Sequence, residues 1–432
     1  MRILIAGTSS GCGKTTMSIL LMAALRLRGL DVMPYKVGPD YVDPGFHRVV
    51  TGNLSYNLDS WIMKREHIPS LLKNNSDISV IEGVMGYYDG LNAESFDCST
   101  YEIARLTDTP VLLTVDASGG AASVAATVKG FKMLAHDSLI KGVLVNRVSS
   151  EGHFGLIQRA VERHTGLKCF GYLKKQTNLE LPSRQLGLVP AMETPNLMKR
   201  ISEAAAKAIE TLNTDAILGL AATAPEIKAV PSQELPDRRG YRLGVAMDDG
   251  FNFYYRANLE TLKNCGMELV YFSPMRDSAL PEGLSGLYIG GGYPEVFKER
   301  LSANASMRNS IKRALEGGLS CYAECGGLMY LGSEIDGAPM VGFLPLKSRM
   351  TDRLQRFGYV TVTDKSGLSF PAHEFHHALS EPLAGASFAY EVTKASRPQN
   401  KWACGYEKGA ALAAFAHVYF ADKPWLIQRF FK

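Results

Sequence analysis

The chain has 432 residues and a formal net charge of +4, and 46% of its residues are hydrophobic and 21% are charged. This length is too great for one ordinary core, so we expect a globular protein of two domains. Because the positive charge is spread thinly, neither a nucleic-acid partner nor a membrane partner is expected. The seven cysteines lack metal-binding spacing and the first apolar stretch is too short for a secretory signal, so we expect a reducing cytoplasm.

A glycine-rich loop follows that first apolar stretch. Residues 2–6 predict a buried parallel strand, and residues 17–28 predict a helix directly after the loop. A strand, a loop ending in Gly-Lys-Thr and a helix are typical of the phosphate-binding loop of a nucleoside triphosphatase. Lys14 would neutralise the phosphates of ATP, and the Thr15 hydroxyl would bind Mg²⁺. Thr8 occupies the place of the first glycine in the standard pattern, and the loop resembles that of dethiobiotin synthetase-like ATPases.

Carboxylates follow later strands of this half. Asp40 and Asp43 come after an apolar run over 31–37, while Glu82 ends a run over 78–81 and Asp89 follows it. Ligands of open α/β sheets bind at the carboxyl ends of strands. We therefore expect Thr15, Asp40 and Glu82 to hold Mg²⁺, and Asp43 and Asp89 to meet the substrate. The alternative for the aspartates is a role in turns.

Strands and helices alternate through the first half, which predicts a doubly wound, mostly parallel α/β sheet. Further strands are expected over 111–116, 140–145 and 168–173, and helices over 99–106 and 119–136. Arg184 could meet a carboxylate-rich substrate or a phosphate. We assign 1–210 to a P-loop ATP-dependent synthetase domain and the proline-bearing segment 211–240 to a linker. The residues assigned to ATP are Gly11, Gly13, Lys14, Thr15, Thr16 and Asn146, the last being an adenine contact or a simple turn residue.

The second half, 241–432, begins with the same α/β pattern and later becomes more β-like. Strands are expected over 242–248, 268–272 and 286–289, a helix over 254–265, and later strands over 340–346 and 358–362. After the third strand, Gly291 and Gly292 belong to a run of three glycines. Their backbone N–H groups could form an oxyanion hole, although a flexible loop would have the same composition. The run His373 to His377 lacks the spacing of a zinc-binding helix, so a metal site is not favoured there.

Cys325 stands between an apolar run over 319–323 and a helix-compatible run over 328–331. A tight turn between a strand and a helix raises a side chain above the sheet and favours a thiolate nucleophile. A buried core cysteine is the alternative. Gly326, next to the cysteine, would add to the oxyanion site.

His417 interrupts the apolar run over 410–420 and would be the proton-transferring partner of Cys325. A satisfied core histidine is the alternative when His417 is considered alone. An orienting acid would often stand two residues later, where this chain has Tyr419. The site could therefore be a dyad.

An ATP site joined to a thiol site has one economical explanation. Cys325 attacks the side-chain amide of L-glutamine and releases ammonia, while the first domain uses ATP to activate a carboxylate as an acyl phosphate. Ammonia then displaces phosphate. The predicted enzyme is thus a ligase that forms carbon–nitrogen bonds with glutamine as amido donor.

The chain resembles the cobyrinate a,c-diamide synthase family over nearly its whole length, on the motifs GTSSGCGKTT, KVGPDYVDPGFH, EGVMGYYDG, FNFYYRANLE, YFSPMRD, GGGYPE, YAECGGLMYL and HEFHH. The resemblance implies a dethiobiotin synthetase-like domain and a class I glutamine amidotransferase domain of flavodoxin-like build. It implies two ATP-driven amidations of cobyrinic acid in cobalamin biosynthesis, on the c and then the a acetate side chain, with Mg²⁺ and the site residues named above. Ser183 and Gln185 depart from the family, whose members resemble LPERHLGL at this position. A homodimer is left open.

Three alternatives differ in substrate or class. A nickel-sirohydrochlorin a,c-diamide synthase of coenzyme F430 biosynthesis would use the same chemistry, but Gly38-Pro39-Asp40 resembles the corrin branch more closely. A regulatory ATPase with a ligand-binding, non-catalytic C-terminal domain would usually have another lysine early in the loop, which is absent here. A biotin-pathway synthetase would not account for the second half.

Overall fold

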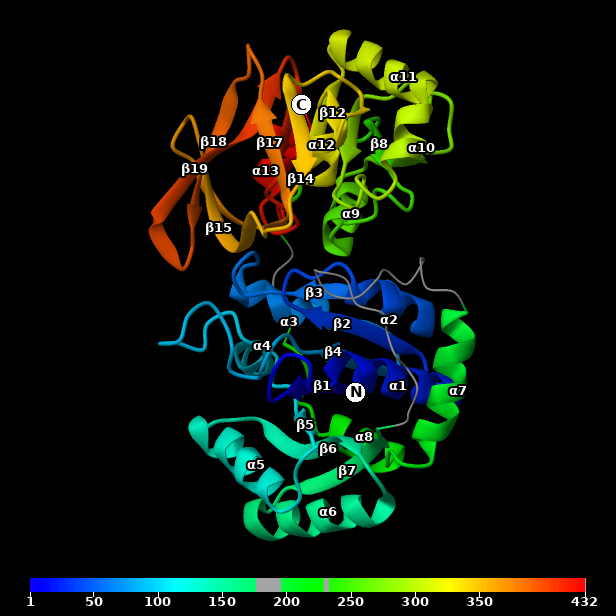
Figure 1. The fold of residues 1–432 in the computed structure, drawn as a ribbon, viewed down its shortest axis with the longest axis vertical. Helices are drawn as coiled ribbons and strands as arrows, with labels where there is room; N and C mark the ends of the chain where they lie inside the picture. The colour runs from blue at the N-terminus through cyan, green and yellow to red at the C-terminus, as the bar shows by residue number, and fades with distance from the viewer. Residues whose placement is uncertain (176–195, 229–232, 432) are drawn as a thin grey trace. The chain divides into compact units, whose positions relative to one another are not determined.

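The computed structural model describes residues 1–175, 196–228 and 233–431, and the chain divides into two compact units, Met1–Pro231 and Ser232–Lys432 (Figure 1). Three residues singled out from the sequence, Ser183, Arg184 and Gln185, lie outside the described residues. No helix within the described ranges is long and apolar enough to cross a membrane.

The first unit is built on a seven-stranded sheet whose strands all run parallel to their neighbours. The strands are β1 (Arg2–Gly7), β2 (Val32–Val37), β3 (Tyr56–Leu58), β4 (Ile78–Glu82), β5 (Val111–Asp116), β6 (Ile140–Val148) and β7 (Lys168–Lys174). Their order in the sheet is β3-β2-β4-β1-β5-β6-β7. Strands β1, β2 and β4 are buried along their whole length, as expected for a sheet covered on both faces. Because these three strands are adjacent and parallel, the loops at their carboxyl ends gather at one edge.

The helices of the first unit are α1 (Lys14–Leu27), α2 (Asp43–Thr51), α3 (Ile68–Leu71), α4 (Thr100–Leu106), α5 (Ser123–Leu134), α6 (Glu151–Thr165), α7 (Leu197–Ile209) and α8 (Thr214–Ala221), with a 3₁₀ turn at Arg65–His67. Helices α1, α2, α7 and α8 share one core with the sheet. Helix α8 lies within the segment that the sequence analysis assigned to the linker, and Ile217 and Ala221 are buried in this core. The reason is that α8 has an apolar face that packs against α1 and β1.

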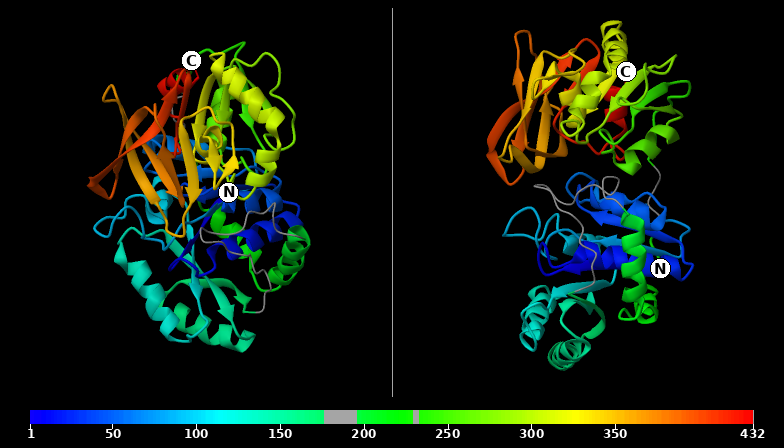
Figure 2. Two further views of the ribbon diagram at one scale, coloured as in Figure 1. Left: turned by 45° about the horizontal axis from the view of Figure 1, so that its top comes forward. Right: turned by 45° about the vertical axis from the view of Figure 1, so that its right-hand side comes forward.

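The second unit combines a parallel sheet with an antiparallel extension. The strands are β8 (Arg242–Ala246), β9 (Glu268–Phe272), β10 (Gly286–Ile289), β11 (Ser320–Glu324), β12 (Glu334–Ile335), β13 (Ala338–Pro339), β14 (Leu346–Met350), β15 (Arg356–Asp364), β16 (Ser369–His376), β17 (Ala378–Pro382), β18 (Phe388–Lys394), β19 (Arg397–Lys408) and β20 (Ala411–Ala414). Nine of them form one sheet in the order β16-β15-β18-β19-β20-β11-β10-β8-β9. The pairs from β20 to β9 are parallel, and those from β16 to β20 are antiparallel (Figure 2). Strands β13, β12, β14 and β17 form a small second sheet.

The helices of the second unit are α9 (Arg256–Asn264), α10 (Lys298–Ala303), α11 (Ala305–Glu316), α12 (Gly326–Leu331) and α13 (Pro424–Phe430). Helix α11 shows how the sequence specifies them: Met307, Ile311 and Leu315 recur every four residues and are buried, and the Asn304 side chain accepts a hydrogen bond from the Met307 N–H. The α/β architecture predicted for both halves is confirmed: the sheet of the first unit is parallel throughout, and in the second unit the part from β20 to β9 is parallel.

One predicted strand of the second unit differs from the structure, and the apolar run that contains His417 is a strand only in part. The strand expected over 340–346 is wrong, because β14 begins only at Leu346. Instead, the N–H groups of Val341 and Phe343 bond to carbonyls at the end of α12, so this apolar segment is buried as irregular chain. In the apolar run over 410–420, β20 ends at Ala414, and His417 pairs only through an isolated bridge to His373.

Candidate active sites

The loop between β1 and α1 is tightly folded. Gly11 and Gly13 have φ angles of 77° and 100°, in the left-handed region that favours glycine. A Cβ atom at Gly7 would lie 2.4 Å from the Cys12 Sγ and 2.7 Å from the Lys14 Cγ, so the loop leaves no room for a larger residue. The Lys14 Nζ donates to the Ser9 carbonyl at 2.9 Å, and burial lowers the pKa of this lysine. The ammonium is thus held within the loop that would surround the phosphates.

Asn146, at the end of β6, supports this loop from the side. Its Nδ2 donates to the Cys12 carbonyl at 2.9 Å, and a Cβ atom at Gly13 would lie 2.0 Å from the same nitrogen. The amide therefore fixes the loop conformation and explains why position 13 needs glycine. An adenine contact by Asn146 stays a prediction.

A buried cluster of charges lies where β2 and β4 end. The Lys36 Nζ lies 2.6 Å from the Asp43 Oδ2 and 3.0 Å from the Glu82 Oε1. The Thr15 Oγ1 donates to Glu82 at 2.6 Å, and the His47 Nε2 lies 2.7 Å from the other Glu82 oxygen. Side chains from α1, β2 and α2 thus meet at the Glu82 carboxylate.

The pKa values in this cluster follow from burial and charge. Burial opposes the charged form of Glu82, but Lys36, His47 and Thr15 together hold the pKa of this carboxyl well below its ordinary value. Burial likewise opposes the charge on Lys36, yet Asp43 and Glu82 raise its pKa. Burial, followed by the charge of the neighbouring Asp40, raises the pKa of Asp43 although Lys36 opposes this shift. Carboxyl oxygens of Asp43 and Glu82 thus lie together beside one ammonium, and an added cation could share these oxygen donors.

Sequence reasoning missed Lys36 and His47. Lys36 had a signal, since it is a charged residue inside an apolar strand that is buried throughout. His47 stands four residues after Asp43 on α2, a spacing that places both on one face of the helix. Their shared partner, Glu82, could not be read from the chain because it belongs to another strand.

The two other predicted acids have local roles in the structure. Asp40 accepts hydrogen bonds from the Val42 and Asp43 N–H groups at 2.7 and 3.3 Å, so it shapes the turn before α2. The exposed Asp89 accepts from the Gly86 N–H at 2.8 Å, in a turn that abuts the phosphate-type loop. At the predicted metal site, the acid that lies within 3.5 Å of the Thr15 hydroxyl is Asp43, whereas the sequence analysis had placed Asp40 there.

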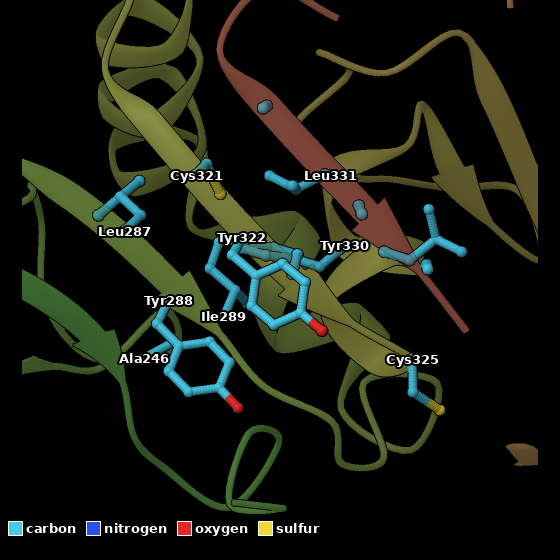
Figure 3. Packing of buried hydrophobic residues seen from close by; sticks show 14 of the residues in the cluster. Ala246, Leu287, Tyr288, Ile289, Cys321, Tyr322, Cys325, Tyr330 and Leu331 are labelled. Atoms are coloured by element: carbon cyan, nitrogen blue, oxygen red, sulfur yellow. The ribbon is translucent and has the colours of Figure 1, made fainter. Parts of the chain in front are cut away.

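In the second unit, Cys325 lies just beyond the end of β11, at the sharp turn into α12 (Figure 3). Its backbone has φ 48° and ψ −103°, an unusual conformation for a residue with a side chain. The Cys325 N–H donates to the Ala414 carbonyl of β20 at 2.7 Å, which fixes the turn to the sheet. This is the geometry expected of a nucleophile raised above a sheet.

The glycine run after β10 meets this turn. A Cβ atom at Gly326 would lie 3.2 Å from the Gly292 nitrogen, and one at Gly291 would lie 2.5 Å from the His417 Cε1. A Cβ atom at Gly327 would lie 2.2 Å from the Ile289 carbonyl oxygen. The structure therefore brings Gly291, Gly292 and Gly326 close to Cys325 and His417. An oxyanion role for these glycines stays a prediction.

His417 is fixed through His373 of β16. Two backbone hydrogen bonds of 2.9 and 3.3 Å join these residues, and their rings stack with centroids 4.9 Å apart. The His373 Nδ1 lies 3.0 Å from the Tyr255 hydroxyl, and burial followed by the charge of His417 lowers the pKa of His373 well below its ordinary value. Burial opposes the charge on His417 too, but its hydrogen bonds and attraction to Cys325 and Glu324 raise its pKa to about 10. The His417 ring is therefore held in its charged, imidazolium form beside Cys325.

Glu324, the last residue of β11, is a further acid that sequence reasoning missed. Its Oε2 lies 3.5 Å from the His417 Nδ1, and its side chain is almost fully buried. The only signal in the sequence was an acid at the end of an apolar strand, directly before the cysteine. Tyr419, at the position where an acid was sought, packs its ring edge-on against Tyr255 instead.

Comparisons with known proteins assign each unit to a family of domains. Residues 3–189 match the CobQ/CobB/MinD/ParA nucleotide binding domain, and residues 242–425 match the CobB/CobQ-like glutamine amidotransferase domain. A nucleotide-binding unit joined to an amidotransferase unit defines a glutamine-dependent carbon–nitrogen ligase.

Curated relatives match the chain over nearly its full length. The cobyrinate a,c-diamide synthase of Caldanaerobacter subterraneus subsp. tengcongensis is 42% identical over 442 residues, covering 99% of this chain and 97% of the relative. That of Listeria innocua is 41% identical, covering 100% and 98%, and that of Clostridium acetobutylicum is 42% identical, covering 97% of each. The chain belongs to the cobyrinate a,c-diamide synthase family.

Proposed function

We propose that this chain amidates the a and c acetate carboxylates of cobyrinic acid in cobalamin biosynthesis, using glutamine and ATP. The observation that carries the proposal is the Cys325 turn, which faces His417 and the glycine run in a chain that also has a phosphate-type loop. The full-length relatives bear the name of this activity, which favours the corrin over nickel-sirohydrochlorin.

The second unit supplies ammonia. The Cys325 thiolate attacks the side-chain amide carbon of glutamine, and the N–H groups of the glycine run stabilise the oxyanion that forms. The carbon–nitrogen bond then breaks, and His417 gives its proton to the departing ammonia. Water gives a proton to the neutral His417 ring and attacks the resulting thioester, which releases glutamate and restores the Cys325 thiolate.

The first unit activates the acceptor. The γ-phosphoryl group of ATP passes to a carboxylate of the corrin, and ammonia displaces phosphate from the acyl phosphate to leave an amide. Gly11, Gly13 and Thr16 line the phosphate site, where the Lys14 ammonium stabilises the charge that develops during transfer. Asp89 and Arg184 are proposed to meet the substrate.

The donors near Thr15 fit Mg²⁺, which prefers oxygen ligands. A hydroxyl and two carboxyl groups, those of Thr15, Asp43 and Glu82, lie together and present oxygen donors to one point. Asp40 stays a candidate from the adjacent turn. When bound with ATP, Mg²⁺ would neutralise phosphate charge.

The test is mass spectrometry of cobyrinic acid incubated with the protein, glutamine and Mg-ATP, with nickel-sirohydrochlorin in parallel. Two successive amidations of the corrin are expected. Amidation of the nickel compound alone would move the protein to the other pathway, and ATP hydrolysis without amidation of either would overturn the substrate assignment. Because all seven cysteines are free and the mechanism needs a reduced thiol, we place the reaction in the cytoplasm. A homodimer is compatible with this chemistry.

A further inference from the structure

The acid that faces the His417 ring is Glu324, which precedes His417 in the chain. We propose that Glu324 is the positioning residue of the glutaminase site, where its carboxylate orients the His417 ring and stabilises its protonated form. The inference rests on the proposed function, because it concerns the step in which His417 transfers a proton. It replaces the expected dyad with three residues, two of which, Glu324 and Cys325, are neighbours in the chain.

The carboxylate of Glu324 is held in one orientation. Its Oε1 accepts hydrogen bonds from the Tyr322 hydroxyl at 2.8 Å and from the Val418 N–H at 3.1 Å. Its Oε2 accepts from the Tyr288 hydroxyl at 3.3 Å. Three donors from two strands and from the segment that contains His417 thus fix an almost fully buried acid. Fixed charges of this kind are effective because no reorganisation is needed during the reaction.

The two nitrogens of the His417 ring face different groups. The Nδ1 faces Glu324 at 3.5 Å, whereas the Nε2 lies on the side of the glycine run, 3.3 Å from a Cβ atom built at Gly291. An acid on one nitrogen and the reacting groups on the other is the arrangement that sets the orientation and tautomer of a catalytic imidazole. Glu324 therefore acts through His417 and does not touch the substrate.

The surroundings leave Glu324 as the main source of negative charge for the ring apart from the thiolate. The titratable groups that face His417 include Cys325 and Glu324 from β11 and its turn and His373 from β16, and Tyr255 reaches His373. His373 stays neutral at ordinary pH because its pKa is strongly lowered, so it contributes a flat neutral surface. Removing the negative charge of Glu324 should therefore destabilise the protonated form of His417 and lower its pKa.

A purely structural role for Glu324 is the competing explanation, since its carboxylate also anchors Val418. The variant Glu324→Gln separates the two, because an amide oxygen can still accept from the Val418 N–H while the charge is lost. Glu374→Gln is a matched control: Glu374 has the same burial, 1% exposed, and its Oε2 lies 3.7 Å from the His376 Nε2. Both variants remove one buried carboxylate beside one histidine, but only one of them faces His417.

The experiment measures glutamine hydrolysis by the full-length chain as a function of pH. We expect E324Q to lower kcat roughly 10- to 100-fold. The alkaline limb of the pH–rate profile, which reports loss of the His417 proton, should move to lower pH by about one unit. E374Q should leave both unchanged. A normal limb in E324Q, or the same shift in E374Q, would overturn the proposal.

A second readout covers the case in which turnover is too slow to follow. Alkylation of Cys325 by iodoacetamide, measured by mass spectrometry of its peptide, should be slower in E324Q at neutral pH because the thiolate loses its stabilised partner. If E324Q does not fold, E324D retains the charge at a greater distance and should shift the limb in the same direction, and an unshifted limb in E324D would overturn the inference. Absence of glutamine hydrolysis in the unaltered protein would instead contradict the proposed function itself.

Discussion

Lys36 and Glu82 form an ion pair of 3.0 Å in which neither side chain is more than 4% exposed. The same ammonium lies 2.6 Å from Asp43, so one positive charge serves two acids from different elements. Lys36 thereby joins the ends of β2 and β4 to the start of α2 and keeps the two carboxyl groups close together.

The substitution Lys36→Met should destabilise the first unit, because it leaves two buried carboxylates without their partner. We expect a loss of about 3–5 kcal/mol in the free energy of unfolding, measured by urea denaturation. Lys347→Met is the control, since Lys347 and Glu381 form an exposed pair at 3.7 Å, which should contribute about 0–1 kcal/mol. Equal losses in both variants would show that the buried cluster has no special role.

The substitution Lys14→Ala should separate the two half-reactions. The Lys14 ammonium would stabilise the charge on the transferred phosphoryl group. Its removal from the phosphate-type loop should therefore lower the rate of ATP-dependent amidation about 100-fold or more. Glutamine hydrolysis, measured as glutamate released, should persist. Loss of both activities would contradict separate sites.

The substitution Cys325→Ala should abolish the use of glutamine and leave amidation with ammonium chloride. The alanine cannot form the thioester, but free ammonia can still attack the acyl phosphate. Amide formation is followed by mass spectrometry with each nitrogen source in turn. Cys321→Ala is a suitable control because Cys321 is buried near the start of β11, outside the site. Failure with ammonium would assign the cysteine to folding or to the synthetase site.

The substitution Asp40→Asn tests whether this residue acts through its charge. Asparagine can still accept the Val42 N–H, so the free energy of unfolding should change by less than about 0.5 kcal/mol. Amidation should fall roughly tenfold or more if the charge serves the metal or the substrate. Asp237→Asn is the control, because Asp237 makes a comparable local turn with the Arg239 N–H in the second unit. An unchanged rate would reduce Asp40 to a turn residue.

The stability contributed by His417 should depend on pH. Its pKa rises from an ordinary 6.5 to about 10 in the folded protein, so its stabilising charge interactions are fully present below pH 6.5 and are lost as pH rises towards 10. The difference in urea midpoint between the unaltered protein and His417→Gln should therefore shrink over this range. His136→Gln, at an exposed position, should show no such trend. A constant difference would contradict the ion pair.

Much of the fold could be predicted because its signals are local. The strands over 111–116, 268–272 and 286–289 agree with β5, β9 and β10 residue by residue, since continuous apolar runs end at polar or glycine-rich turns. The antiparallel extension was largely missed, because its strands are half-exposed and their pairing depends on distant partners.

The candidate sites show the same division. Lys14 and Cys325 were predicted because a loop or turn of fixed shape surrounds each of them in the sequence. Glu324 was missed because its partner, His417, belongs to a distant segment, and the search for an acid followed the chain to Tyr419. The topology that places β20 beside β11 brings these two residues together, and one sequence alone does not specify that pairing.

At position 325, backbone preference and chemistry favour different amino acids. A φ of 48° is natural for glycine and costs a side-chain-bearing residue about 1–3 kcal/mol. A glycine there would relax the turn, yet it would remove the sulfur atom. We therefore expect that a descendant supplied with ammonia, and freed from the need for glutamine, would drift towards glycine at this position and become more stable as it did so. The strained backbone of Cys325 is thus the structural consequence of placing a sulfur atom where the turn alone would favour glycine.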